Sequence, residues 1–215
     1  MNGATRRERL ARARLYLVIE ARPHGRDPDA LLAAALRGGV DIVQLRDKEL
    51  RDEELVRAAA SFRRACDACG ALFVLNDRPD LVEACGADGV HVGQDDEPVA
   101  EARALVGAEL LVGLSTHSRA EMDAARGADY IGVGTIFATP TNPESNAAGL
   151  ELVRTASEAA RLPWFAIGGI ELANVALVAE AGARGIAVVR AIRDAPDPEA
   201  AARALRAALG EPPPS

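Results

Sequence analysis

The chain has 215 residues and a formal net charge of −7, with 49% apolar and 27% charged residues. This length and composition suit one globular α/β domain of barrel size. The acidic balance argues against nucleic acid as the main partner, because phosphate backbones are bound by clustered cations. No apolar run approaches the ~20 residues that span a bilayer, and the arginine-rich segment 1–14 lacks the apolar stretch of a secretory signal. We therefore expect a cytoplasmic protein that binds neither nucleic acid nor a membrane.

Apolar β-rich segments alternate with helical segments along the chain. We expect strands at residues 15–19, 41–45, 72–75, 89–92, 110–114, 130–133, 164–167 and 186–189. Helical periodicity predicts helices at 29–37, 52–68, 119–126, 150–161, 172–181 and 199–209, with shorter ones near 79–85 and 98–106. We interpret 1–14 as a polar arm, 15–210 as the folded domain and 211–215, with its three prolines, as a disordered tail.

Strands that are continuously apolar are typical of a parallel sheet that helices cover on the outside. Eight βα units predict a single-domain (β/α)8 TIM barrel. An open doubly wound sheet is the alternative, but no Gly-x-Gly-x-x-Gly motif follows the first strand. In a barrel, the reactive face lies at the carboxyl ends of the strands, and the amino ends of these strands offer little beyond Gly and Asp turns.

Charged and amide residues gather after the second, third and fourth expected strands. They are Gln44, Arg46 and Lys48, then Asn76 and Asp77, then Asp96. Cations bind phosphate oxygens, and paired carboxylates hold a hard metal ion that bridges to the same phosphates. The pattern therefore predicts chemistry on a diphosphate ester, with Mg²⁺ bound by the carboxylates of Asp77 and Asp96.

These residues also have plainer interpretations. Asp77 and Asp96 both lie shortly before a proline, where a carboxylate can cap the following helix. Arg46 and Lys48 can instead pair with Glu49 or Asp52 at a solvated helix entry. His117 stands where a helix begins, so it is either a helix-entry residue or an acid–base group.

The later strand ends carry hydroxyl groups and glycines. Ser115 ends the fifth strand, Thr139 and Thr141 lie in the long loop after the sixth, Gly168 and Gly169 follow the seventh, and Val189 and Arg190 end the eighth. Barrels commonly bind phosphate through backbone amides after their last two strands. We therefore expect a second anion site there, on the same face as the metal site.

Six segments of the chain resemble the thiamine-phosphate synthase family. They are residues 44–48 (QLRDK), 75–81 (LNDRPDL), 89–96 (GVHVGQDD), 113–118 (GLSTHS), 134–141 (GTIFATPT) and 166–170 (AIGGI). The resemblance implies a (β/α)8 barrel transferase. Such an enzyme joins 4-amino-2-methyl-5-hydroxymethylpyrimidine diphosphate to a thiazole phosphate and releases pyrophosphate with Mg²⁺. It also implies a dissociative reaction, in which charge on the leaving group must be neutralised.

The family motifs imply a role for each matching residue. Gln44, Arg46, Lys48 and Asn76 would hold the pyrimidine diphosphate, Asp77 and Asp96 would bind Mg²⁺, and Ser115 would meet the pyrimidine; Thr139, Thr141, Gly169 and the Val189-Arg190 backbone would bind the thiazole phosphate. Among them, Arg46, Lys48 and Ser115 are the predicted catalytic residues.

Two positions depart from the family pattern. Asn142, which we also expect to contact substrate, stands where relatives usually have Lys, and Arg190 stands where many have Ser. A thiazole tautomerase on the same barrel, with His117 as its acid–base group, and a non-catalytic barrel that binds phosphate ligands are the competing interpretations. The sequence leaves a homo-oligomer open.

Overall fold

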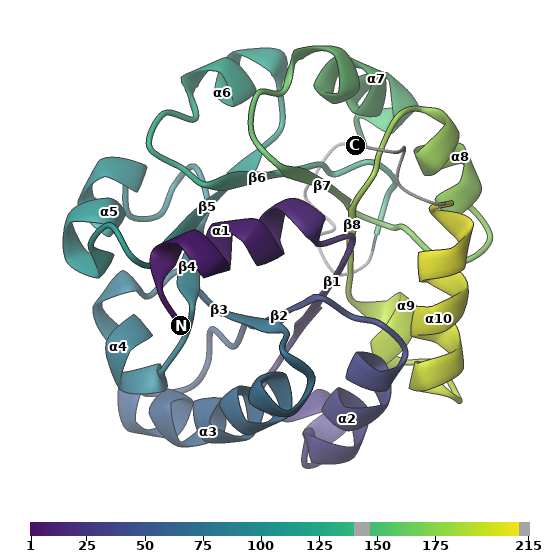
Figure 1. Cartoon of the computed structure of the whole chain (residues 1–215). Helices are drawn as coiled ribbons and strands as arrows, with labels where there is room; N and C mark the ends of the chain where they lie inside the picture. Colours follow the sequence, from purple (N-terminus) through teal and green to yellow (C-terminus); the bar gives the residue numbers. More distant parts are fainter. Residues whose placement is uncertain (140–146, 211–215) are drawn as a thin grey trace.

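The computed structural model describes residues 1–139 and 147–210, and its parallel strands close into a barrel in chain order (Figure 1). The strands are β1 (Leu15–Ile19), β2 (Ile42–Leu45), β3 (Leu72–Asn76), β4 (Gly89–Val92), β5 (Leu111–Thr116), β6 (Tyr130–Val133), β7 (Trp164–Ile167) and β8 (Ile186–Val188). β1 pairs with both β2 and β8, so the sheet has no free edge. The predicted (β/α)8 barrel is confirmed, with strand bounds within two residues of those expected.

Helices surround the barrel and cover its outer face, except for the first, which lies across one end (Figure 1). They are α1 (Gly3–Arg12), α2 (Asp29–Arg37), α3 (Asp52–Cys69), α4 (Val82–Cys85), α5 (Val99–Val106), α6 (Arg119–Ala124), α7 (Gly149–Ala159), α8 (Val175–Glu180), α9 (Arg190–Arg193) and α10 (Pro198–Ala208), with 3-10 turns η1 (Pro23–Gly25) and η2 (Pro79–Leu81). α8 begins later than expected because Asn174 ends a turn, in which its side chain accepts from the Glu171 amide at 2.9 Å. No helix within the described ranges combines the length and the apolar character that a bilayer crossing needs.

The strands are buried on both faces, which explains why their sequences do not alternate between apolar and polar residues. Side chains of alternate residues point into the barrel. The apolar cluster inside it contains Leu10, Tyr16, Val18, Ile42, Leu72, Val74, Leu111, Tyr130, Phe165 and Ala187. A larger cluster packs between the strands and the helices. Apolar side chains therefore fill the lower barrel and leave its carboxyl end for polar groups.

The segment that we expected to be a polar arm contains helix α1, which lies across the amino end of the barrel (Figure 1). Asn2 caps the helix by accepting a hydrogen bond from the Thr5 amide at 2.9 Å. Leu10 packs inside the barrel, and Arg6 pairs with Asp88 at 3.0 Å. The arginines of this segment therefore attach a helix to the barrel instead of extending into solvent.

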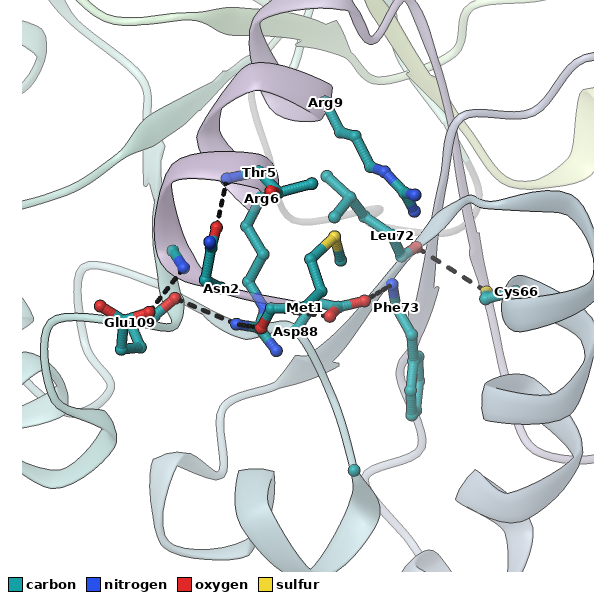
Figure 2. Close-up of polar contacts among 12 residues, drawn as sticks. Met1, Asn2, Thr5, Arg6, Arg9, Cys66, Leu72, Phe73, Asp88 and Glu109 are labelled. Atoms are coloured by element: carbon teal, nitrogen blue, oxygen red, sulfur yellow. Dashed lines mark hydrogen bonds and ion pairs between the residues drawn. The ribbon is translucent and has the colours of Figure 1, made fainter.

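Three strands are each preceded by an aspartate, and its carboxylate accepts a hydrogen bond from a backbone amide of the previous strand in the sequence. Asp41 accepts from the Leu15 amide at 3.0 Å, Asp88 from the Phe73 amide at 3.0 Å and Asp129 from the Val112 amide at 2.8 Å. Each of these carboxylates also pairs with at least one arginine. Figure 2 shows Arg6 and the Phe73 backbone converging on Asp88 beneath α1. The Asp turns at the amino ends are thus structural ties between strands.

Candidate active site

A cavity of about 450 Å³ opens at the carboxyl ends of the strands. Every strand contributes at least one residue to its wall, namely Tyr16 and Val18 of β1, Gln44 of β2, Asn76 of β3, His91 of β4, Ser115 of β5, Tyr130 of β6, Phe165 of β7 and Ala187 of β8. Active sites of barrel enzymes lie at this face, because the loops that follow the strands converge there.

Most of the residues predicted from sequence meet at this cavity. The predicted residues that line its wall are Gln44, Arg46, Asn76, Ser115, Thr139, Gly169, Val189 and Arg190. Lys48, Asp77 and Asp96 do not line it but form a cluster next to Asn76 at the ends of β3 and β4. Thr141 and Asn142 lie outside the described residues.

The Asp77 carboxylate lies between a cation and a second carboxylate. Lys48 Nζ is 2.9 Å from Asp77 Oδ2. Burial and the neighbouring Asp96 raise the pKa of Asp77 above its ordinary value, while Lys48 opposes that shift. The Asp77 backbone has a left-handed φ of 59° and donates to the His91 carbonyl oxygen at 2.8 Å. This conformation is costly for a residue other than glycine, and such strain is typical of functional sites.

The plainer interpretations of these charged residues are not what the structure shows. η2 and α5, the helical segments after Asp77 and Asp96, have no side-chain cap, and Asp96 instead accepts from the Gly93 amide at 2.9 Å. Asp52 pairs with Arg78 at 2.6 Å, and Lys48, which follows β2, pairs with Asp77 and not with Asp52. The Arg46 side chain forms no ion pair or hydrogen bond with the part of the chain that the structure describes. Its guanidinium is therefore free to bind an anion.

The paired carboxylates fit a divalent cation. Burial and the neighbouring Asp96 both raise the pKa of Asp77, and a bound cation would relieve the repulsion between the two carboxylates. Within residues 1–139 and 147–210, no group of three or more His, Cys, Asp or Glu side chains could surround an ion. Asp77 and Asp96 are neighbours, so these two carboxylates could hold an ion together. Mg²⁺ suits such a site, since it binds through one or two carboxylates and fills its other positions with water and phosphate.

A chain of polar side chains crosses the floor of the cavity. Tyr16 OH lies 2.7 Å from Gln44 Nε2 and 2.9 Å from Tyr130 OH. His91 Nδ1 lies 3.2 Å from Tyr130 OH, and His91 Nε2 lies 3.0 Å from Ser115 Oγ. This chain links Gln44 and Ser115, the two floor residues predicted from sequence, through three residues that the sequence analysis missed.

The three missed residues are neutral at physiological pH. Burial lowers the pKa of His91 to about 4, so its imidazole is uncharged. Burial also raises the pKa values of Tyr16 and Tyr130 well above that of a free phenol, so both keep their protons. The floor of the cavity is therefore an uncharged hydrogen-bonding surface, and the charges lie at its rim.

Glycines and a cation border the cavity at β7 and β8. Gly168 and Gly169 follow β7 with positive φ values of 107° and 62°, and a Cβ on Gly169 would lie 2.8 Å from the Phe137 carbonyl oxygen. Arg190 follows β8 and makes no side-chain hydrogen bond or ion pair within the described ranges. His117 also lines the cavity, and its Nδ1 lies 3.1 Å from Glu121 Oε2.

A closed (β/α)8 barrel with a polar cavity lined by arginines at its carboxyl face has the design of a barrel enzyme. Residues 15–192 match the family model described as thiamine monophosphate synthase. A thiamine-phosphate synthase of Streptomyces avermitilis is 50% identical over 202 residues, which cover 92% of this chain and 94% of that one. The chain therefore belongs to the thiamine monophosphate synthase family, and it is a transferase of thiamine biosynthesis.

Other relatives agree with this family. A thiamine-phosphate synthase of Mycobacterium leprae is 48% identical, with 94% of this chain and 92% of that one covered. The solved structure of a thiamine phosphate pyrophosphorylase from Pyrococcus furiosus superposes with a TM-score of 0.84 at 33% identity, over 94% of this chain and 96% of that one. A 3-hexulose-6-phosphate synthase, at 23% identity and a TM-score of 0.64, shares the fold.

Proposed function

We propose that the protein joins 4-amino-2-methyl-5-hydroxymethylpyrimidine diphosphate to a thiazole phosphate, with Mg²⁺ as cofactor and pyrophosphate as the second product. The observation that carries this proposal is the cluster at one edge of the cavity. There Asp77, Asp96 and Lys48 lie together, and Arg46 lines the neighbouring wall without an ion pair in the described residues. A diphosphate needs both kinds of group, cations for its oxygens and carboxylates for the bridging metal ion.

The reaction that these residues favour is a dissociative substitution. The bond between the pyrimidine methylene carbon and the diphosphate oxygen breaks first, and both electrons leave with pyrophosphate. The thiazole nitrogen then donates its lone pair to the resulting carbocation, and a C–N bond forms without any proton transfer. This sequence requires no general base, which suits a cavity whose floor histidine, His91, is a weak base because burial lowers its pKa to about 4.

Charge neutralisation on the leaving group is the main task of the protein groups. Arg46 can bind diphosphate oxygens through two parallel N–H donors, and Lys48 can add a point charge. Mg²⁺ held by Asp77 and Asp96 would neutralise further negative charge on the diphosphate. A pyrimidine ring packed against the uncharged floor would exclude water from that side, where water would otherwise capture the carbocation.

The thiazole phosphate fits the opposite side of the cavity. Gly169 and the backbone at Val189 border that side, together with Thr139 and the exposed side chain of Arg190. A backbone free of Cβ atoms lets phosphate oxygens approach amide donors, and a guanidinium adds charge-assisted hydrogen bonds. We assign the phosphate of the thiazole to this part of the cavity.

One observation favours a second candidate function. His117 lines the cavity, and Glu121 orients its imidazole, which is the arrangement of a positioned acid–base group. A thiazole tautomerase would use such a group to move a proton without metal.

One assay distinguishes the two functions. The purified protein is incubated with both phosphorylated substrates, with either one alone, and with or without Mg²⁺, while pyrophosphate and thiazole isomers are measured. We expect pyrophosphate release that needs both substrates and the metal. The matched variants are Asp96→Asn, which should abolish most of this release, and Asp95→Asn, which changes an exposed carboxylate and should leave it unaltered. Metal-independent isomerisation of the thiazole with no pyrophosphate would overturn the proposal.

A further inference from the structure

The hydrogen-bonded chain on the cavity floor has a definite direction. Its first link is the Gln44 amide, which donates from Nε2 to Tyr16 OH at 2.7 Å. The side chains of Gln44 and Tyr16 are 3% and 2% exposed, so no bulk solvent supplies other partners. A phenol has one proton to donate. Since Tyr16 accepts from Gln44, the proton of Tyr16 has Tyr130 OH, 2.9 Å away, as its acceptor.

The same counting fixes the links that follow. Tyr130 accepts from Tyr16, so it donates its own proton to His91 Nδ1 at 3.2 Å. A neutral imidazole that accepts at Nδ1 carries its proton on Nε2. His91 Nε2 therefore donates to Ser115 Oγ, 3.0 Å away. The hydroxyl proton of Ser115 then has no partner among the residues that the structure describes, and it is free to point into the cavity.

We propose that Tyr16, Tyr130 and His91 are positioning residues that make Ser115 a hydrogen-bond donor toward the substrate and leave the Gln44 side-chain oxygen as an acceptor. The 4-aminopyrimidine ring has the matching groups, an exocyclic amine that donates and ring nitrogens that accept. This inference rests on the proposed function for the identity of its ligand. The direction of the chain itself rests on the contacts of the free protein.

The backbone around the central link is shaped to admit it. A Cβ on Gly113 of β5 would lie 2.2 Å from the Tyr130 ring carbon that carries the hydroxyl group and 2.5 Å from His91 Nδ1. Separations this short do not occur in folded proteins, so any larger residue would push the phenol and the imidazole apart. Gly132 of β6 is less restrictive, because a Cβ there would lie 3.5 Å from the nearest His91 ring atom, at ordinary contact distance. Tyr130 itself is fully buried. The central link thus depends on glycine at position 113.

The direction of the chain has a consequence for specificity. A 4-oxo analogue of the pyrimidine presents the opposite pattern, because its exocyclic oxygen accepts and its adjacent ring N–H donates. Against a donor at Ser115 and an acceptor at Gln44, this analogue places its acceptor beside the Gln44 oxygen and its donor beside the Ser115 hydroxyl proton, so it must reorient one of these groups or lose a hydrogen bond, which is unfavourable. The floor would therefore select an amino over an oxo substituent through three side chains that need not touch the ring.

The direction is tested by the tautomer of His91. The protein has three histidines, so ¹⁵N labelling of histidine gives few imidazole signals, and the variants His24→Gln and His117→Gln assign the other two. At pH 7 we expect His91 to carry its proton on Nε2 in the unliganded protein. In Tyr130→Phe the donor to Nδ1 is lost, and a mixture of tautomers should appear. A proton on Nδ1 in the unmodified protein would reverse the chain and overturn the inference.

The specificity is tested by binding and does not depend on turnover. Calorimetry with Mg²⁺ and no thiazole compares the aminopyrimidine diphosphate with its 4-oxo analogue, on the unmodified protein and on Tyr130→Phe. We expect the preference for the amino compound to fall by about tenfold or more in the variant. An unchanged preference would contradict the inference even if the variant folds normally. If neither compound binds while His91 has the Nε2 proton, the proposed substrate is wrong but the direction of the chain stands.

Discussion

Replacing Asp88 by Asn should destabilise the protein strongly without touching its active site. The Asp88 side chain is 3% exposed and lies at the amino end of the barrel, under α1 (Figure 2). Its oxygens lie 3.0 Å from Arg6 Nε and 2.8 Å from Arg63 Nη1, and one of them accepts from the Phe73 amide. The variant keeps the shape of the side chain and removes only its charge and one acceptor.

The loss of stability in Asp88→Asn depends on the two arginines that would remain without a charged partner. Both arginines would then face an amide in a buried place, and Arg63 Nε already lacks a partner in the described part of the chain. Removing one member of a buried ion pair costs about 3–5 kcal/mol. For a chain of this length, each kcal/mol shifts Tm by about 2–4 °C, so we expect Tm to fall by about 6–20 °C.

The matched control is Asp67→Asn. Asp67 also pairs with Arg63, at 2.9 Å, but its side chain is 67% exposed. Solvent-exposed ion pairs contribute about 0–1 kcal/mol, so this variant should unfold almost like the unmodified protein. Urea and thermal unfolding, followed by circular dichroism, measure both variants. Equal losses for Asp88→Asn and Asp67→Asn would refute the reasoning, because burial is the main feature that separates the two carboxylates.

Three other predictions follow from the site and from buried groups. Arg190→Ser should raise the KM for the thiazole phosphate by about tenfold, and unchanged KM and kcat values would show that Arg190 does not serve that site. Burial raises the pKa of the Cys66 thiol to about 12 and that of Cys85 to about 11, so a disulfide reagent at pH 8 should modify only the exposed Cys69; rapid reaction of a second thiol would contradict this. Burial lowers the pKa of His91 to about 4, from about 6.5 in the unfolded state, so the unfolded state binds a proton first as the pH is lowered. The free energy of unfolding should therefore fall by up to about 3 kcal/mol as the pH is lowered from about 6.5 to about 4. His91→Gln should lack that part of the pH dependence, and identical pH profiles for the two proteins would count against it.

The strands and the rim of the site could be predicted because their signals are local. A run such as Val43-Gln44-Leu45 followed by Arg46 shows both a buried strand and the polar residue that ends it. The closure of the barrel then brings these ends together. The floor was missed because Tyr16 and Tyr130 read as ordinary β-formers within apolar strands. Only the register reveals that they point inward, on the same side of their strands as the polar floor residues.

The N-terminal helix was missed for a different reason. Arginines in a segment of low hydropathy predict exposure, and the local sequence contains nothing that would bury them. The partners of Arg6 and Arg7 are Asp88 and Asp129, which lie 82 and 122 residues away in the chain. Such pairs depend on tertiary structure, because only the folded barrel brings the turns before β4 and β6 under the same helix.

The aspartate ties at the amino ends also divide the barrel into units for engineering. In each of the strand pairs β1–β2, β3–β4 and β5–β6, the aspartate that precedes the second strand accepts a hydrogen bond from an amide of the first strand. Each pair with its helices therefore forms a natural quarter of the barrel. Chimaeras with related barrels are best joined between quarters, because a junction within one would separate an aspartate from its amide. The last quarter has Gly185 at the equivalent place, where a Cβ would lie 2.8 Å from the Phe165 ring. Lacking this tie, β7–β8 is the quarter to exchange first.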